Sequence, residues 1–149
     1  MKKLATILTA AVLFIGTQSF TPVTTVTQAV QHSFSRHFGT VSAVSWERSG
    51  EYYFASFKIN GCETTAAYSP QGDLIGTSRR IPMSALPVKV TTALNENYPG
   101  HAFSAEAMEI DYSGETHYYF SAQDDSKFLK LKATPEGTLT VMDKIRKVQ

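Results

Sequence analysis

The turn Ser69-Pro70-Gln71-Gly72-Asp73-Leu74 returns 65 positions later as Thr134-Pro135-Glu136-Gly137-Thr138-Leu139. The triplet Tyr52-Tyr53-Phe54 also returns, as Tyr118-Tyr119-Phe120. Self-similarity at a nearly fixed spacing is the sequence signature of a structural unit that is built more than once. We therefore expect two copies of one unit in this chain.

Each copy begins with apolar residues at four-residue spacing, which is the pattern of one buried face on an amphipathic helix. The first stripe ends near Gly39 and the second near Pro99-Gly100, where a helix is expected to stop. Pro87 suits the first turn of the second helix, because its missing N–H costs nothing there. The two stripes are Val26, Val30, Phe34 and Phe38, and Leu86, Val90, Leu94 and Tyr98.

After each stripe the apolar period changes to two, and turn signals arrive often enough to indicate an antiparallel meander. The fold class is therefore α+β, with two tandem helix plus four-stranded antiparallel meander repeats and the helices packed on one side of the sheets. The expected strands are Val41–Arg48, Glu51–Ile59, Cys62–Ser69 and Asp73–Ser78 in the first repeat, and Ala105–Tyr112, Thr116–Gln123, Phe128–Thr134 and Thr138–Met142 in the second.

The first residues have the layout of a secretory signal. Met1-Lys2-Lys3 is positively charged, and Leu4–Ile15 carries no charge and is too short to span a bilayer. We expect cleavage after Ser19, a periplasmic or secreted protein, and no stable membrane insertion after the signal is removed. The expected domains are a signal peptide at 1–19, a first α-β4 repeat at 20–80 and a second at 81–149, joined by a linker at Arg79–Leu86.

Charge and cysteine content exclude two classes of protein. Without Lys2 and Lys3, 12 of the 14 basic residues remain against 13 acidic ones, so the mature chain lacks the basic character of a nucleic-acid binder. Cys62 is the single cysteine, which excludes an intramolecular disulfide scaffold. In an oxidising compartment we expect Cys62 to be a small buried residue.

The dipeptide Asn60-Gly61 predicts a two-residue type I′ hairpin, which fixes the register of the first sheet. It places Ile59 opposite Cys62 and Tyr53 opposite Tyr68 on an apolar face that packs on the helix. A second two-residue turn, at Ser49-Gly50, would place Trp46 beside Tyr53. The open face of the sheet then carries Tyr52 and Phe54, with the charge pair Lys58 and Glu63.

Aligning the two aromatic triplets transfers this pattern to the second repeat. Its core face is then expected to hold Met108, Ile110, Tyr119, Leu129 and Leu131. Aromatic side chains on the water side of a sheet, surrounded by charges, are typical of a protein-binding surface. Alternatively, the open faces pack against each other and the aromatics are core. The predicted partner-binding residues are Tyr52, Phe54, Tyr118, Phe120, Glu109, Asp111, Lys130 and Lys132.

These features resemble the PepSY-like, β-lactamase-inhibitor-like proteins exported by Bacteroides-type bacteria. The resemblance rests on the tandem helix-plus-meander units, on Leu86-Pro87 and Tyr98-Pro99-Gly100 around the second helix, and on the two Pro-x-Gly-x-Leu turns. It covers roughly residues 24 to 149. It implies helices on one side of antiparallel sheets, an extracytoplasmic location, no established catalytic residues and an open sheet face as the contact surface.

Motifs for catalysis are absent from the sequence. It contains no Gly-x-Ser-x-Gly elbow and no Gly-rich phosphate loop. His32 and His37 are five residues apart, which does not stack them on one helical face as a zinc pair requires. We therefore expect no enzyme activity, no catalytic residues, no metal and no cofactor.

The expected function is an exported, non-catalytic binding or inhibitory module that contacts a protein partner in the cell envelope through the open sheet faces. One alternative is a binder of a small apolar or glycan ligand on the same aromatics. A further alternative is an envelope hydrolase that uses the acidic or histidine residues of the second repeat. The sequence specifies neither the partner nor the oligomeric state.

Overall fold

The computed structural model describes residues 19–147, so the predicted signal at 1–19 lies outside the described residues except for Ser19. The fold is α+β, with two α-helices among the described residues. The elements are β1 (Thr21–Pro22), α2 (Gln28–Phe38), β2 (Val44–Ser49), β3 (Tyr52–Ile59), β4 (Cys62–Tyr68), β5 (Leu74–Pro82), a 3-10 helix η1 (Met83–Ala85), α3 (Val88–Asn97), β6 (Ala102–Phe103), β7 (Glu106–Tyr112), β8 (Glu115–Gln123), β9 (Lys127–Ala133) and β10 (Leu139–Arg146).

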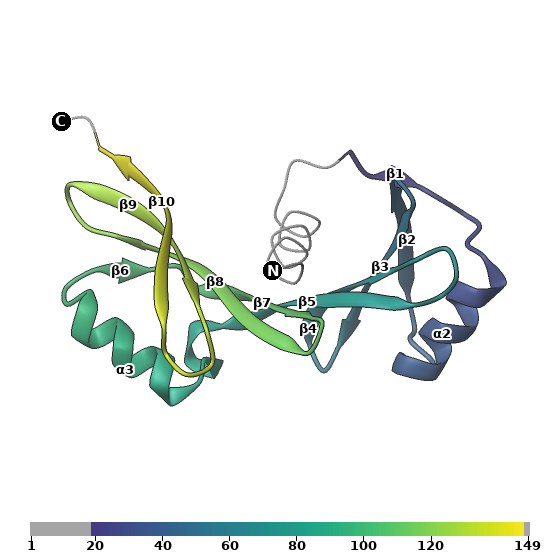
Figure 1. The fold of residues 1–149 in the computed structure, drawn as a ribbon, viewed down its shortest axis with the longest axis horizontal. Helices are drawn as coiled ribbons and strands as arrows, with labels where there is room; N and C mark the ends of the chain where they lie inside the picture. Colours follow the sequence, from purple (N-terminus) through teal and green to yellow (C-terminus); the bar gives the residue numbers. More distant parts are fainter. Residues whose placement is uncertain (1–18, 148–149) are drawn as a thin grey trace, which may run out of the picture. The chain divides into compact units, whose positions relative to one another are not determined.

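The strands form one ten-stranded antiparallel open sheet in the order β1-β2-β3-β4-β5-β7-β8-β9-β10, with β6 paired to β8 (Figure 1). The chain divides into two compact units, which we describe separately. Unit 1 contains the described residues up to Arg79 together with Asp111–Gly114. Unit 2 contains Arg80–Ile110 and the described residues from Glu115 onward.

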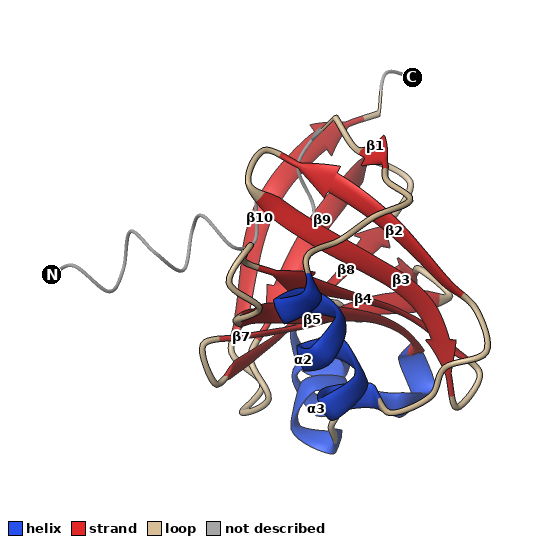
Figure 2. Cartoon of the chain, turned by 90° about the vertical axis from the view of Figure 1, so that its right-hand side faces the viewer, coloured by secondary structure: helices blue, strands red, loops and turns tan. Residues whose placement is uncertain are grey.

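In unit 1, the predicted helical stripe forms α2. Thr27 caps its first turn, because the Thr27 hydroxyl oxygen accepts a hydrogen bond from the Val30 N–H at 3.3 Å. Gly39 ends the helix at a φ of 68°, a conformation that favours glycine. Figure 2 shows α2 beside the strands. The buried side chains of Val30 and Phe34 pack against the sheet residues of the unit 1 core. Burial of each stabilises the fold by about 1.5 to 3 kcal/mol.

The hairpin of β3 and β4 confirms the predicted register. Asn60 and Gly61 both have positive φ, at 51° and 78°, as a type I′ turn requires. Ile59 pairs with Cys62, Lys58 with Glu63 and Tyr53 with Tyr68. The side of the sheet that faces α2 carries the residues predicted for it, among them Ala55, Phe57, Ala66 and Tyr68.

The pairing of β2 with β3 differs from the prediction by two positions. The turn consists of Gly50 and Glu51, not of Ser49 and Gly50, so Trp46 pairs with Ala55 and Arg48 pairs with Tyr53. A shift of two residues leaves every side chain on its predicted face, because side chains alternate with a period of two.

The prediction of a linker at Arg79–Leu86 is wrong for the first half of that segment. Strand β5 continues to Pro82, and η1 follows it. Ile81 explains the extended conformation, since its side chain is 4% exposed and belongs to the core of unit 2. The linker residues are therefore part of the packed structure.

In unit 2, Pro87 is the residue before α3, which begins at Val88. The stripe residues Leu86, Val90 and Leu94 are buried as predicted. They pack against the sheet side chains of one continuous apolar cluster, which includes Ala107, Tyr118, Phe120, Leu129 and Leu131.

Both Pro-x-Gly turns contact the first turn of a helix. In unit 1, the Gly72 N–H donates to the Ser69 carbonyl at 3.0 Å, and the Thr27 hydroxyl donates to the Pro70 carbonyl at 3.0 Å. In unit 2, the Gly137 N–H donates in the same way to the Thr134 carbonyl at 3.0 Å. Gly72 lies close to the backbone of Ala29 and Gly137 close to that of Lys89, so each turn packs against a helix.

Candidate functional site

In each unit, we call the side of the sheet that faces away from the helix of that unit the open face. In unit 1, cross-strand pairing places Glu47, Phe54, Ala67 and Gly76 in one row across β2 to β5 on this face. The neighbouring row consists of four hydroxyl side chains, and the hydroxyls of Ser56 and Thr65 are 3.2 Å apart. The hydroxyl row is Ser45, Ser56, Thr65 and Ser78.

The predicted placement of Tyr52 and Phe54 on this face is confirmed. Their neighbours Tyr53 and Ala55 pack on the side of α2, so alternation directs Tyr52 and Phe54 to the open face. Tyr52 is half-buried, whereas Phe54 is only 2% exposed. The ring of Phe20 lies edge-on to that of Phe54, with centroids 5.0 Å apart. Phe54 is therefore covered, and Tyr52 is the more accessible of the two.

The predicted placement of Tyr118 and Phe120 on the open face of unit 2 is wrong. They are 6% and 7% exposed and belong to the helix-side cluster with Leu129 and Leu131. Phe120 pairs with Leu131 and Tyr118 pairs with Ala133, so each shares its face with a core residue.

A one-residue slip in the alignment causes this error. The triplets are 66 positions apart, whereas the Pro-x-Gly turns are 65 apart. At an offset of 65, the pair Tyr53 and Tyr68 corresponds to the pair Tyr118 and Ala133, and both pairs occur in the sheet. A slip of one residue moves every side chain of a strand to the opposite face.

The same slip misplaces the acidic residues of β7. Ala107 is 2% exposed and lies in the helix-side cluster, so alternation places Glu109 and Asp111 on that side. This side of β7 is opposite to the open face on which the sequence predicts them. Ile110 is 3% exposed but is outside the helix-side cluster to which the prediction assigned it.

Lys130 and Lys132 do lie on the open face of unit 2. Lys130 pairs with Ser121 and Lys132 pairs with Tyr119, and all four alternate with core residues. Lys130 also forms an ion pair with Asp143 at 3.2 Å. The aromatic residue of β8 on this face is thus Tyr119, opposite Lys132, although the sequence predicts Tyr119 in the core.

The open face of unit 2 also carries apolar side chains that the sequence interpretation missed. Ile145 of β10 pairs with Phe128 of β9, and Ile145 is 50% exposed. The sequence of β9 could have identified this face, because Leu129 and Leu131 alternate with Lys130 and Lys132. A leucine at every second position specifies which side of β9 is core.

A cluster of charges surrounds His117 on β8. Alternation from Tyr118 places His117 on the open face with Tyr119. Burial lowers the pKa of His117, the nearby Lys132 ammonium lowers it further, and Glu115 and Glu136 act in the opposite direction. This half-buried imidazole is thus biased toward its neutral form.

Among residues 19–147, the contact between His101 and Asp124 resembles part of a catalytic site. His101 Nε2 lies 3.2 Å from Asp124 Oδ2, while the other carboxylate oxygen accepts hydrogen bonds from the Ser126 N–H, the Ser126 hydroxyl and the Lys127 N–H. The remaining ring nitrogen of His101 faces the Pro99 carbonyl at 3.4 Å. The carboxylate therefore holds the turn between β8 and β9 together, and no hydroxyl nucleophile is positioned on the imidazole.

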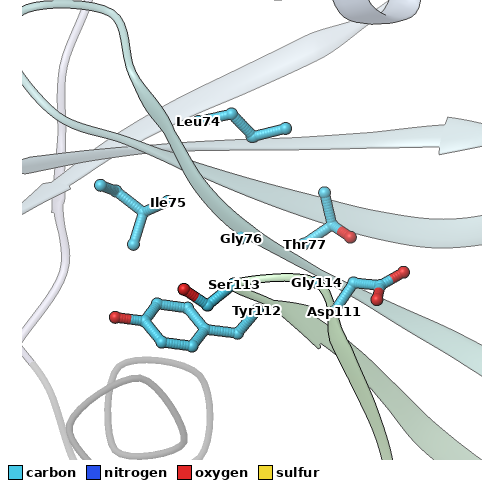
Figure 3. A pocket seen from close by; sticks show the side chains of 8 residues that line it. All are labelled: Leu74, Ile75, Gly76, Thr77, Asp111, Tyr112, Ser113 and Gly114. Atoms are coloured by element: carbon cyan, nitrogen blue, oxygen red, sulfur yellow. The ribbon is translucent and has the colours of Figure 1, made fainter. Parts of the chain in front are cut away.

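Unit 1 contains a broad cleft of about 530 Å³, which Figure 3 shows at close range. Its apolar lining includes Ile75 and Tyr112, and Thr77 and Asp111 contribute polar atoms. Figure 3 shows the Tyr112 ring and the Asp111 side chain pointing away from each other, so the cleft offers an aromatic ring and a carboxylate at separate places in its lining.

Within residues 19–147, no group of three or more His, Cys, Asp or Glu side chains is arranged to hold a metal ion. Across the same residues, no helix is long and apolar enough to cross a membrane.

Comparison of the fold with solved structures finds similar proteins from Bacteroides. A DUF2874 family protein from Bacteroides ovatus matches with a TM-score of 0.70 and 18% identity, covering 83% of this chain and 89% of that one. A BLIP-like protein from Bacteroides fragilis matches with a TM-score of 0.69 and 20% identity, covering 83% and 88%. A predicted periplasmic protein from Bacteroides eggerthii matches with a TM-score of 0.68 and 15% identity, covering 82% and 89%.

The expected structural resemblance to BLIP-like proteins of Bacteroides is therefore confirmed at the level of the fold. No protein-family model matches the sequence, and a search of curated proteins finds no match.

Proposed function

We propose that this protein is an exported, non-catalytic module that binds a protein partner of the cell envelope through its open faces, as a binder or an inhibitor. The observation that carries the proposal is the side-chain content of these faces. Unit 1 presents the half-buried ring of Tyr52, and unit 2 presents Tyr119 opposite Lys132, with Lys130 on the same face. Aromatic residues within a polar surround are typical of residues that dominate protein interfaces.

The structural neighbours support this proposal. The BLIP-like description of the Bacteroides fragilis protein suggests inhibition, and the periplasmic description of the Bacteroides eggerthii protein suggests export. The signal layout at 1–19 favours the same compartment. The matching backbone bonds of the two Pro-x-Gly turns further support the view that the two units are copies of one repeat.

The test is affinity capture from envelope extracts of the native cell with open-face variants. We expect Tyr52→Ala and Lys132→Glu each to reduce recovery of a specific partner at least tenfold without changing the urea midpoint. Glu96→Lys is the matched control, since Glu96 is exposed on α3, on the helix side. Equal recovery with all three variants would contradict the proposal.

A second candidate is a small apolar or glycan ligand in the cleft beside Tyr112 and Asp111. Rings of aromatic residues provide stacking surfaces, and the Asp111 carboxylate can accept hydrogen bonds from hydroxyl groups. A panel of envelope oligosaccharides should then shift the amide resonances of Thr77 and Ser113. Shifts confined to Tyr119 and Lys132 would exclude the cleft as the site.

A further inference from the structure

The segment Phe20–Val23 lies along the edge of β2 and is held by strand pairing. Thr21 pairs with Arg48 and Pro22 pairs with Glu47. The Val23 N–H donates a hydrogen bond to the Trp46 carbonyl at 3.0 Å. The chain therefore places a short extended segment where a sheet edge would otherwise offer its own backbone groups.

Side chains of this segment contact both sides of the sheet. Phe20 lies edge-on to Phe54 on the open face, with ring centroids 5.0 Å apart and planes at 89°. Val23 packs on the opposite side, against the core cluster of α2. The site on β2 thus accepts an aromatic residue and, three positions later, a β-branched apolar residue.

The segment is held by few contacts. Strand β1 contains only two residues, and β2 contains six. Pro22 has no N–H and cannot donate to the ladder. Phe20 itself remains 39% exposed. A longer extended segment could form more hydrogen bonds to β2 than Phe20–Val23 does.

We propose that the edge of β2, together with Phe54, is a site for strand addition by an extended segment of the protein partner, which displaces Phe20–Val23. The segment would carry an aromatic residue followed three positions later by valine or isoleucine. Backbone pairing would supply affinity, and the Phe54 contact would supply selectivity. This inference rests on the proposed function, because it states where and how the partner binds.

The closing experiment uses the chain that begins at Phe20 and a synthetic peptide with the sequence of residues 20–25. Calorimetry would measure its binding to the unsubstituted chain and to the Phe20→Ala variant. We expect at least tenfold tighter binding to Phe20→Ala, because the competing aromatic side chain is removed. A peptide with alanine in its first position should bind at least tenfold more weakly.

Changes in the amide resonances of Glu47 and Arg48 would show that the peptide binds at β2. The control variant is Val141→Ala, which removes an exposed apolar side chain elsewhere. Equal affinity for both peptides, no saturable binding, or no effect of Phe20→Ala would overturn the inference. A dimer formed by Phe20→Ala without peptide would also overturn it, since a second copy would then be the occupant. If peptide binding fails while partner capture still depends on Tyr52, this inference fails and the proposed function stands.

Discussion

Gly72 and Gly137 occupy equivalent positions in the two Pro-x-Gly turns. Both have positive φ, at 89° and 92°, and both lie against the backbone of a helix. A Cβ atom on Gly72 would lie 2.6 Å from the Ala29 carbonyl oxygen, and one on Gly137 would lie 2.6 Å from the Lys89 carbonyl oxygen. The glycines therefore allow both an unusual backbone conformation and close contact of turn and helix.

We predict that Gly72→Ala and Gly137→Ala each lower the free energy of unfolding by about 2 to 4 kcal/mol, as positive-φ strain is added to overpacking. Gly114→Ala is the matched control, because Gly114 has a φ of 80° and open space around it. It should cost about 1 to 2 kcal/mol. Urea denaturation measures all three, and equal losses would show that turn and helix are not in close contact.

The carboxylate of Asp124 is held by hydrogen bonds from the turn that follows it. Hydrogen bonds from Ser126, and then from Lys127, hold the pKa of the Asp124 carboxyl far below its usual range. Since the folded-state pKa is lowered, this carboxylate stabilises the fold above the unfolded-state pKa of about 3.9. That contribution is lost as the pH falls toward the folded-state value.

Asp124→Asn should therefore lower the urea midpoint at pH 7, with a difference from the unsubstituted chain that narrows as the pH falls below about 4. Asp125→Asn serves as control for the loss of a neighbouring exposed carboxylate. Urea midpoints between pH 7 and pH 2 test this. A difference that stays constant across that range would mean that the charge of Asp124 is not what stabilises the turn.

At the scale of elements, local signals predicted more than comparison of the two halves did. Asn60-Gly61 specified a hairpin and its register because the turn type admits only one pairing. The helical stripes predicted α2 and α3 to within a turn. The one-residue slip in unit 2 arose because the turn between β8 and β9 is not a two-residue type I′ turn. The register of unit 2 was therefore predicted only from the alignment of the two aromatic triplets.

Strands β1 and β6, of two residues each, were not predicted. Segments of this length carry no periodicity, and their pairing depends on contacts distant in sequence. The cover of Phe54 by Phe20 was missed for the same reason. Of the predicted site, Tyr52, Phe54, Lys130 and Lys132 lie on open faces.

The corrected register predicts unequal losses of stability for substitutions at two adjacent residues of β8. Phe120→Ala should lower the free energy of unfolding by about 3 to 5 kcal/mol, because it removes a ring from the core of unit 2. Tyr119→Ala should cost about 1 kcal/mol or less, since Tyr119 lies on the open face opposite Lys132. Urea denaturation measures the free energy of unfolding of both variants. A larger loss for Tyr119→Ala than for Phe120→Ala would show that Tyr119 is the core residue, as the alignment of the triplets predicts.

At the scale of the whole molecule, the fold is shared with BLIP-like and DUF2874 proteins at 20% identity or less. Identity this low leaves function to be argued from the residues of this chain. The open faces combine aromatic rings, lysines and exposed apolar side chains, whereas the opposite sides of the sheets are filled by the helices. We accordingly propose that a protein partner contacts the open faces.

The most direct measurement is site-specific photo-crosslinking in the envelope of the native cell. A photoreactive residue would replace Tyr52 or Tyr119 on the open faces, and Gln31 or Glu96 on the helices as controls. We predict one adduct of discrete mass from each open-face position and none from the helix positions. Adducts from Gln31 and Glu96, with none from Tyr52 and Tyr119, would contradict the claim.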